Sequence, residues 1–345
     1  MEPTRPAQVS HFMRYCLGLA GRLISRPLGS LLRGPMTDAK RHHYLPEFYL
    51  EGFANRGKLW AHDREQGKYR EQTPHNTAVL SHYYSYQDEE GVRSTDLEAV
   101  LALVESEAKP VIEKLATRTP ISAAERGALS LFLSLLRMRV PDFEKEVGEL
   151  IDTVYKEVNK IIFATKQSTE AVLKSIAEET GEELHVVPED LMKLAADKNY
   201  EVTMPRAGSL GLTFSLAEDL AKVLYDLHWV VTIAPPGTHF LTTDNPFTIV
   251  PPPPHLRIPH RGVGIVTPGA EKYVPLSSTT LLGMLGPGRG LGFIELPPPY
   301  VEIANNNNAS NCDRFVIGPD EGTIRSAVRA TGVDTSSRRP KWAAR

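Results

Sequence analysis

The sequence contains little cysteine and no long apolar run. Only Cys16 and Cys312 occur among its 345 residues, and neither belongs to a C-x-x-C pair. A framework of several disulfides and a zinc site made of cysteines are therefore excluded, and a reducing compartment, the cytoplasm, is favoured. Because no stretch reaches eighteen consecutive apolar residues, we do not expect an integral membrane protein.

Three motifs that identify common enzyme folds are also missing. No G-x-G-x-x-G follows a strand-like run, and neither G-x-x-x-x-G-K-[ST] nor G-x-S-x-G occurs. These absences disfavour dinucleotide binding, P-loop chemistry and the serine hydrolases that carry the last motif. The nearest glycine cluster, GPGRGLG at 286–292, is interpreted as a hairpin or a loop between strands.

Neither sign of charge dominates the composition. The 39 lysines and arginines stand against 42 acidic residues, which gives a net charge of -3. A nucleic-acid partner would therefore need a local binding site, because the protein as a whole is not basic. Hydrophobic residues make up 41% of the chain, an ordinary share for a globular protein, so a mainly disordered chain is excluded.

Residues 1–38 differ from the rest, since they hold five arginines but only two acidic residues. Three interpretations stay open: a start placed upstream of the natural one at Met36, a disordered extension, or an interfacial or targeting helix. We expect residues 1–35 to make no tertiary contacts. A single domain is predicted over residues 39–330, followed by a disordered tail at 331–345.

Helical patterns dominate the middle of the chain, from residue 96 to residue 227. The run 96–118 has helical spacing, and Pro110 is expected to kink it. Ser122 and Glu125 then form an S-x-x-E capping box in front of an apolar helix that ends at Pro141. Further amphipathic stretches follow as far as residue 227.

Short β-rich runs lie on both sides of this helical block. Residues 58–65 and 67–73 predict two strands joined by a turn, and residues 228–318 contain several strands bounded by proline and glycine. We therefore predict an α+β fold. In it the helical block packs on a mainly antiparallel sheet that is built from N-terminal and C-terminal strands.

The first cluster of candidate site residues is the sequence Arg41-His42-His43-Tyr44. Adjacent side chains in an extended segment point to opposite faces, so the two histidines are not expected to bind one metal together. One of them is a candidate general base or metal ligand. In the alternative, purely structural interpretation, His43 packs beside Tyr44 and Phe48 while His42 is solvated.

The second cluster is TTDNPF at 242–247, at the end of an apolar strand. Asp244 and Asn245 suit a turn in which the carboxylate accepts backbone N–H groups. The same geometry presents a carboxylate and an amide at the rim of a sheet, where metals and substrates are often held. Both interpretations stay open.

The third cluster is Arg137 and Arg139, which precede Pro141 at the end of an apolar helix. Their side chains diverge by roughly 200° around the helix. An arginine that points inward needs an anionic partner, and Asp244 is the candidate. The alternative is that both side chains reach solvent.

Together these segments resemble a bacterial family catalogued as domain of unknown function 4238. The resemblance rests on HHYLPEFYLEGF, LWAHDRE, RMRVP, HFLTTDNPF and YVPLS, and it covers roughly residues 40 to 318. It implies that the family's histidines correspond to His42 and His43, its arginine to Arg139, and its acid–amide pair to Asp244 and Asn245. A glutamine that relatives often carry ahead of the arginine is replaced here by Leu136.

The leading functional hypothesis is a metal-dependent hydrolase that acts on phosphodiesters, with a divalent metal as cofactor. HHxxP is similar to the entry of some His-Me finger nucleases, although the two strands that follow lead to His75 and Asn76 without a convincing helix. The residues assigned to the site are, as catalytic groups, His42, His43, Arg139 and Asp244; as substrate-binding groups, Asn245, Arg137 and Tyr44; and, as metal ligands, Asp244 and His43.

The alternative hypothesis is a non-catalytic binding or sensor protein, for example in a defence or toxin–antitoxin system. Its helical block and proline-rich loops would then serve contact with a partner. Catalysis requires His43, Arg139 and Asp244 to converge in one cleft, whereas a binding protein has no such requirement.

Overall fold

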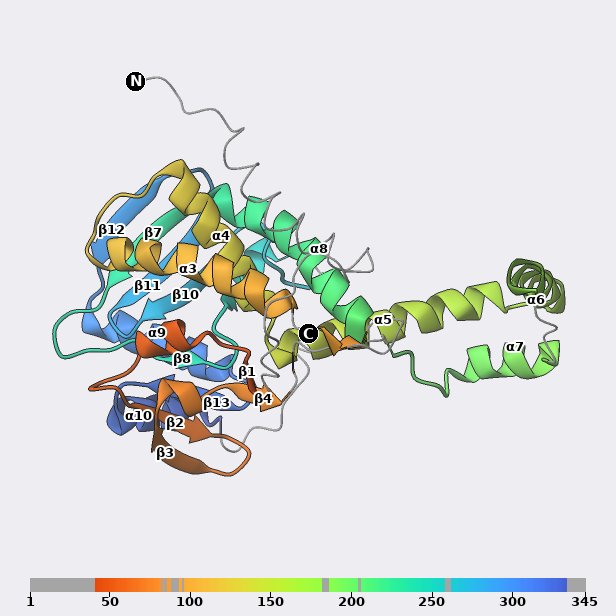
Figure 1. The fold of residues 1–345 in the computed structure, drawn as a ribbon, viewed down its shortest axis with the longest axis horizontal. Coiled ribbons are helices and arrows are strands. Elements are labelled where there is room, and N and C mark those ends of the chain that lie inside the picture. Colours follow the sequence, from red (N-terminus) through yellow and green to blue (C-terminus); the bar gives the residue numbers. More distant parts are fainter. Residues whose placement is uncertain are drawn as a thin grey trace, which may run out of the picture. The chain divides into compact units, whose positions relative to one another are not determined.

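The computed structural model divides the chain into two compact units (Figure 1). The core unit comprises the described residues as far as Val140 and from Leu210 onwards, and the inserted unit spans Pro141–Ser209. The single domain expected over residues 39–330 stays a prediction, and the expectations for residues 1–38 and for the tail after 333 lie outside the described residues. The structure describes residues 41–81, 83, 86–87, 93–94, 96–181, 186–203, 206–257 and 262–333.

The larger sheet of the core unit has five strands in the order β12-β7-β11-β10-β9. Neighbouring strands are antiparallel except for β12, which is parallel to β7. The loop between β11 and β12 is therefore not a hairpin turn, because both strands pair with β7. The strands are β7 (Leu227–Ile233), β9 (Thr248–Val250), β10 (Glu271–Ser277), β11 (Thr280–Pro287) and β12 (Leu291–Glu295).

A second sheet of four strands has the order β3-β2-β13-β8 and is antiparallel throughout. It joins N-terminal strands to C-terminal ones, as predicted, whereas the strands of the larger sheet all come from residues 227–295. The hairpin expected after residue 58 is confirmed. Two short pairs complete the described strands. The strands are β2 (Leu59–Asp63), β3 (Lys68–Gln72), β8 (Thr242–Thr243), β13 (Phe315–Gly318), and the pairs β1 (Arg41–His43) with β4 (Val79–Ser81) and β5 (Tyr86–Gln87) with β6 (Arg93–Ser94).

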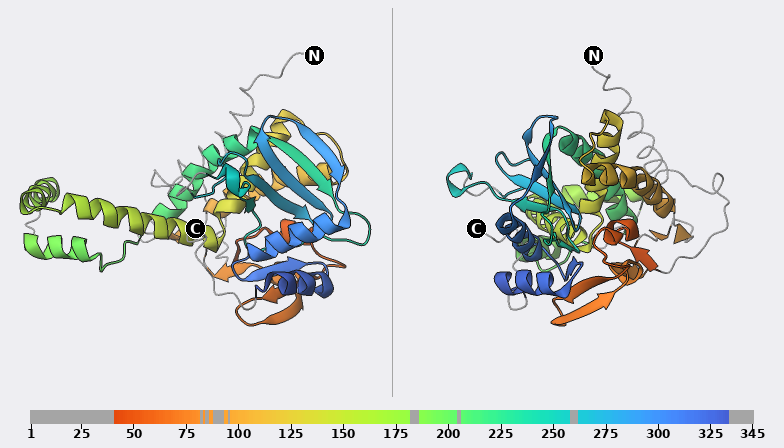
Figure 2. Two further views of the ribbon diagram at one scale, coloured as in Figure 1. Left: turned by 180° about the vertical axis from the view of Figure 1, so that it is seen from behind. Right: turned by 90° about the vertical axis from the view of Figure 1, so that its left-hand side faces the viewer.

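Helices cover both faces of the five-stranded sheet (Figures 1 and 2). On one face, the guanidinium of Arg126 lies 4.0 Å from the ring centroid of the buried Trp229, whose indole N–H donates to the carbonyl of Leu224. On the other, Val301 packs with Tyr273 in a separate apolar cluster. The helices of the core unit are α2 (Glu47–Glu51), α3 (Asp96–Ala116), α4 (Ala123–Met138), α8 (Arg206–Tyr225, from Leu210 onwards), α9 (Pro298–Ser310) and α10 (Glu321–Thr331), with 3₁₀ turns η1 (Pro74–Asn76) and η2 (Pro254–Leu256).

The predicted capping box at the start of α4 is confirmed. The hydroxyl of Ser122 accepts the N–H of Glu125 at 3.2 Å, and the carboxylate of Glu125 accepts the N–H of Ser122 at 2.7 Å. Two of the first orphan N–H groups of the helix are thereby satisfied. Pro110 lies within α3.

The inserted unit consists of α5 (Pro141–Ile162), α6 (Lys166–Thr180) and α7 (Pro188–Asp197). One face of α5 contacts the chain after α7, where the carboxylate of Asp152 accepts the N–H of Val202 at 2.8 Å. The opposite face exposes four apolar side chains, Leu150, Val154, Val158 and Ile161, of which Ile161 is 75% exposed. Among the helices that the structure describes, none combines the length and the apolar character needed to cross a membrane.

Candidate functional site

Strand β1 separates the first cluster into an inner and an outer set. His42 and Tyr44 are buried, whereas Arg41 is exposed and His43 half-buried, so alternate side chains point to opposite faces. The imidazole of His42 lies 3.2 Å from the carboxylate of Glu98 on α3. The expectation of the structural interpretation that His42 is solvated is therefore wrong.

On the outer side, His43 converges with Glu47 and His75. One ligand atom of each residue lies within 4.8 Å of the ligand atoms of the other two. Nδ1 of His75 is 3.2 Å from the carboxylate of Glu47, and the two imidazole rings are 5.7 Å apart between centroids. Sequence reasoning noted His75 but did not connect it with His43, and Glu47 was not considered at all.

Local structure explains why these three residues meet. Pro46 is the N-cap of α2, so Glu47 occupies the first turn of that helix, just after β1 ends. Strand β1 pairs antiparallel with β4, and the N–H of Tyr44 donates to the carbonyl of Ala78 at 3.0 Å, which brings the preceding turn η1 back beside β1. His75 is the middle residue of η1.

The cluster offers the donor set of a transition-metal site. Nε2 of His43 lies 3.0 Å from the carbonyl oxygen of His75. In the tautomer in which Nε2 donates to this carbonyl, Nδ1 holds the lone pair, an arrangement usual for imidazoles that bind metals. Two imidazoles and one carboxylate favour zinc or another first-row transition metal over magnesium or calcium, and three protein ligands leave further positions for water and substrate.

Asp244 and Asn245 lie in the interior instead. The two carboxylate oxygens of Asp244 accept the backbone N–H groups of Asp313 at 2.9 Å and Arg314 at 2.7 Å. Burial and the nearby charge of Asp313 raise the pKa of Asp244 to about 7. The carboxylate thus accepts backbone N–H groups, as the structural interpretation expected, but those groups belong to a distant segment rather than to its own turn.

Asparagines from α9 satisfy the backbone around this motif. Asn305 accepts the N–H of Leu241 at 2.8 Å, and Asn308 donates to the carbonyl of Leu241 at 2.9 Å. Asn311, just past the helix, donates to the carbonyl of Asn245 at 2.9 Å. Residues three apart share one helix face, so the asparagines form a row along residues 239–248. The sequence NNNNASN carried this signal, which sequence reasoning missed.

Arg139, at the end of α4, is buried, and its Nη1 donates to the carboxylate of Glu105 on α3 at 2.7 Å. The expectation that Asp244 would be its partner is wrong, because α3 packs beside α4 and supplies the nearer carboxylate. Nε and Nη2 of Arg139 have no partner among the described residues. Arg137 is half-buried.

Tyr44 connects the inner side of the first cluster with Asp244. Burial raises the pKa of Tyr44 well above its ordinary value, and the negative charges of Asp244 and Asp313 add to this effect. The two carboxylates must therefore lie close enough to Tyr44 to act on its charge.

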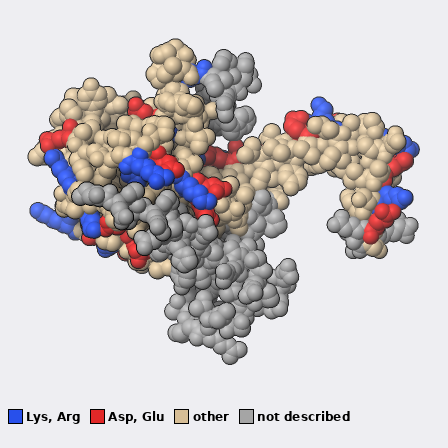
Figure 3. Space-filling view, turned by 90° about the horizontal axis from the view of Figure 1, so that it is seen from above, with Lys and Arg blue, Asp and Glu red and all other residues tan. Residues whose placement is uncertain are grey.

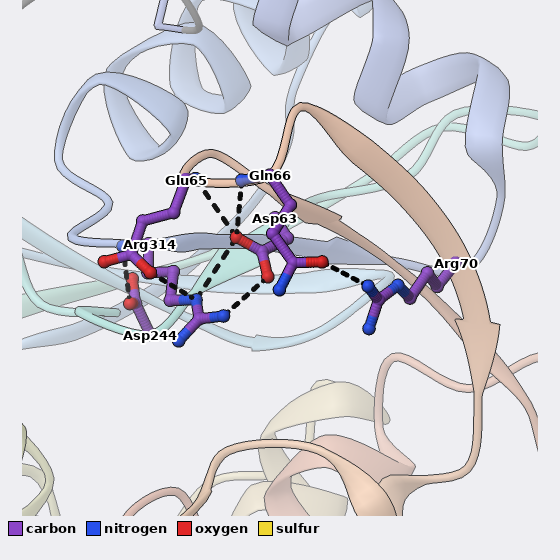
Figure 4. A network of polar contacts seen from close by, with 6 residues as sticks. All are labelled: Asp63, Glu65, Gln66, Arg70, Asp244 and Arg314. Atoms are coloured by element: carbon purple, nitrogen blue, oxygen red, sulfur yellow. Dashed lines mark hydrogen bonds and ion pairs between the residues drawn. The ribbon is translucent and has the colours of Figure 1, made fainter.

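Arg314 belongs to the same region (Figure 4). Its Nη2 and Nε donate to the carboxylate of Asp63 at 2.8 and 3.2 Å. Burial alone would raise the pKa of Asp63, but the hydrogen bonds from Arg314 and from the N–H groups of Gln66 and Glu65 hold that pKa below its usual range. Asp63 and Arg314 therefore bond mainly to each other and to nearby backbone groups.

The structure thus places Tyr44 within electrostatic range of Asp244, and it places His43 with Glu47 and His75. His42 and Arg139 each pair with a carboxylate of α3. The convergence of His43, Arg139 and Asp244 in one cleft stays a prediction.

Comparison with known proteins identifies one family and no characterised relative. The family model described as protein of unknown function (DUF4238) matches residues 41–322. No curated protein and no solved structure matches the chain.

Proposed function

The chain belongs to the DUF4238 family, and we propose that it is a metal-dependent hydrolase that acts on phosphodiesters. The observation that carries the proposal is the meeting of His43, Glu47 and His75 within 4.8 Å. A divalent metal held there would supply a water molecule of lowered pKa and an electrophilic contact for a phosphoryl oxygen. These three residues would bind and orient the metal, and the half-exposed position of His43 leaves the site open to substrate.

This proposal keeps His43 as a metal ligand and replaces the second predicted ligand. Asp244 is a poor ligand, because its oxygens already accept backbone N–H groups and its pKa of about 7 leaves it half protonated near neutral pH. The side chain of Glu47 is 43% exposed, and no backbone N–H of the described residues constrains it in this way. It supplies the carboxylate that the sequence-based hypothesis assigned to Asp244.

The test combines metal binding with turnover. The full chain is stripped with a chelator, titrated with Zn²⁺ and Mn²⁺, and assayed against single-stranded and double-stranded DNA and RNA. Glu47→Gln should lose both stoichiometric metal and turnover. Glu51→Gln is the matched control, because Glu51 lies on the same helix and its carboxylate faces Lys109 at 3.8 Å instead. Wild-type protein that binds no stoichiometric metal, or turnover that survives Glu47→Gln, would contradict the proposal.

A non-catalytic binding or sensor protein is the second candidate. The exposed apolar face of α5 favours it, since such a face is typical of a surface that contacts a partner. Figure 3 shows lysines and arginines interspersed with acidic residues on the face it displays, so nucleic acid would have to bind locally. Stoichiometric metal without turnover of any of the four substrates would favour this candidate.

A further inference from the structure

Arg41 lies beside the metal-binding cluster on the outer side of β1. It precedes His43 by two residues, so both side chains project from the same side of the strand. The Cα atoms of such residues are roughly 7 Å apart, which is within the reach of an arginine side chain. The Arg41 side chain is exposed.

A hydrogen bond anchors this side chain to the turn that carries His75. Nη2 of Arg41 donates to Oδ1 of Asn76 at 3.0 Å, and Asn76 directly follows His75. The amide nitrogen of Asn76 donates to the hydroxyl of Thr73 at 3.2 Å, which orients the amide so that its oxygen faces Arg41. The guanidinium is therefore held next to one ligand of the cluster.

The charge of Arg41 is not neutralised within the described part of the chain. Its one hydrogen bond there is to the neutral amide of Asn76. Arg139 and Arg314, by contrast, both form ion pairs with carboxylates. A guanidinium has five N–H donors in a rigid plane, so Arg41 keeps several donors for a ligand after the bond to Asn76.

We propose that Arg41 holds the anionic group of the substrate, a phosphate, next to the metal site. This inference rests on the proposed function. A phosphoryl group suits the pair of sites because it presents several oxygens, of which one faces the metal while others accept bonds from the guanidinium. Asn76 acts as a positioning residue for Arg41.

The test uses the full, metal-loaded chain with inorganic phosphate as the probe. Arg41→Gln should weaken phosphate binding by about tenfold or more, since a hydrogen bond to a charged group contributes at least that much. Asn76→Ala should weaken it less, because the charge remains and only its anchor is lost. Arg70→Gln is the control. It also removes an exposed arginine, but this one bonds to the neutral amide of Gln66 within the hairpin of β2 and β3.

Metal affinity measured on the same variants separates this inference from the proposed function. We expect Arg41→Gln to bind Zn²⁺ as wild type does. If wild type binds no metal, the proposed function fails and this inference fails with it. If wild type binds metal but Arg41→Gln binds phosphate as tightly as wild type, only the role of Arg41 is refuted. An equal loss of metal and phosphate affinity in Arg41→Gln would also refute it, because Arg41 would then merely support the turn.

Discussion

The segment from Arg41 to Glu47 and the segment from His239 to Thr248 are both rich in polar side chains, but they use them differently. In the second segment the polar atoms bond to the backbone and to the asparagines of α9, and Asp244 and Asn245 are buried. In the first segment Arg41 and His43 face outward and meet side chains from α2 and η1.

This difference shows how the contacts of a polar motif distinguish a structural role from a ligand-binding role. A buried carboxylate that accepts two backbone N–H groups stabilises the fold, and its removal leaves those donors unsatisfied. A group of half-exposed ligand atoms from three separate elements adds little to the fold, because solvated polar contacts are weak. Substitutions in the segment from His239 to Thr248 should therefore lower stability, whereas substitutions in the segment from Arg41 to Glu47 should lower ligand binding.

The largest effect is expected from Asn308→Ala. Asn308 donates to the carbonyl of Leu241 and accepts the hydroxyl of Thr248 at 2.8 Å, and all of these groups are buried. Its loss should lower the free energy of unfolding by about 2–4 kcal/mol, measured by urea titration. Asn306→Ala is the control on the same helix: Asn306 is half-buried, and its loss should cost less than about 0.5 kcal/mol. Equal losses in the two variants would show that the asparagine row does not stabilise the inner segment.

A smaller effect concerns pH. The folded state raises the pKa of Asp244 from its ordinary value of 3.8 to about 7. Between these values the folded state binds more protons than the unfolded state, so this group makes stability fall as pH rises, by up to about 1.4 kcal/mol per pH unit. Asp244→Asn cannot titrate and should lack this component. Urea unfolding of both proteins at pH 4.5, 5.5 and 6.5 measures the two slopes, and parallel slopes would refute the prediction.

Sequence reasoning succeeded where the signal was local. The Ser122 capping box and the opposite orientation of His42 and His43 each follow from patterns within a few residues, and the α+β class follows from the order of such local patterns along the chain. It failed where partners are distant in the chain: the carboxylate that pairs with Arg139 comes from a different helix, 34 residues away. Such partners depend on how the helices and strands pack, and the spacing of residues in a single sequence does not show this.

The proposed metal site shows the same limit of sequence reasoning. Glu47 lies only four residues after His43, but it reads as an ordinary acidic residue in the first turn of a helix. Its closeness to His43 and His75 depends on the pairing of β1 with β4, which returns η1 to the same place. In the sequence, His75 and Asn76 follow two predicted strands, and the absence of a convincing helix after them weakens the similarity to His-Me finger nucleases.

The smallest effect on stability is expected from His75→Ala, which sharpens the contrast between the two segments. Because His75 is exposed, the metal-free variant should match metal-free wild type within about 0.5 kcal/mol in free energy of unfolding. A metal that binds only the folded state adds stability, about 2.7 kcal/mol at a concentration one hundred times its Kd. Wild type should gain this amount in Zn²⁺ and lose it again in chelator, whereas His75→Ala should gain little at the same concentration. His255→Ala, an exposed histidine in η2, is the matched control and should behave as wild type. A gain of equal size in His75→Ala would show that zinc binds elsewhere, and a large loss of stability in the metal-free variant would place His75 among the structural residues instead.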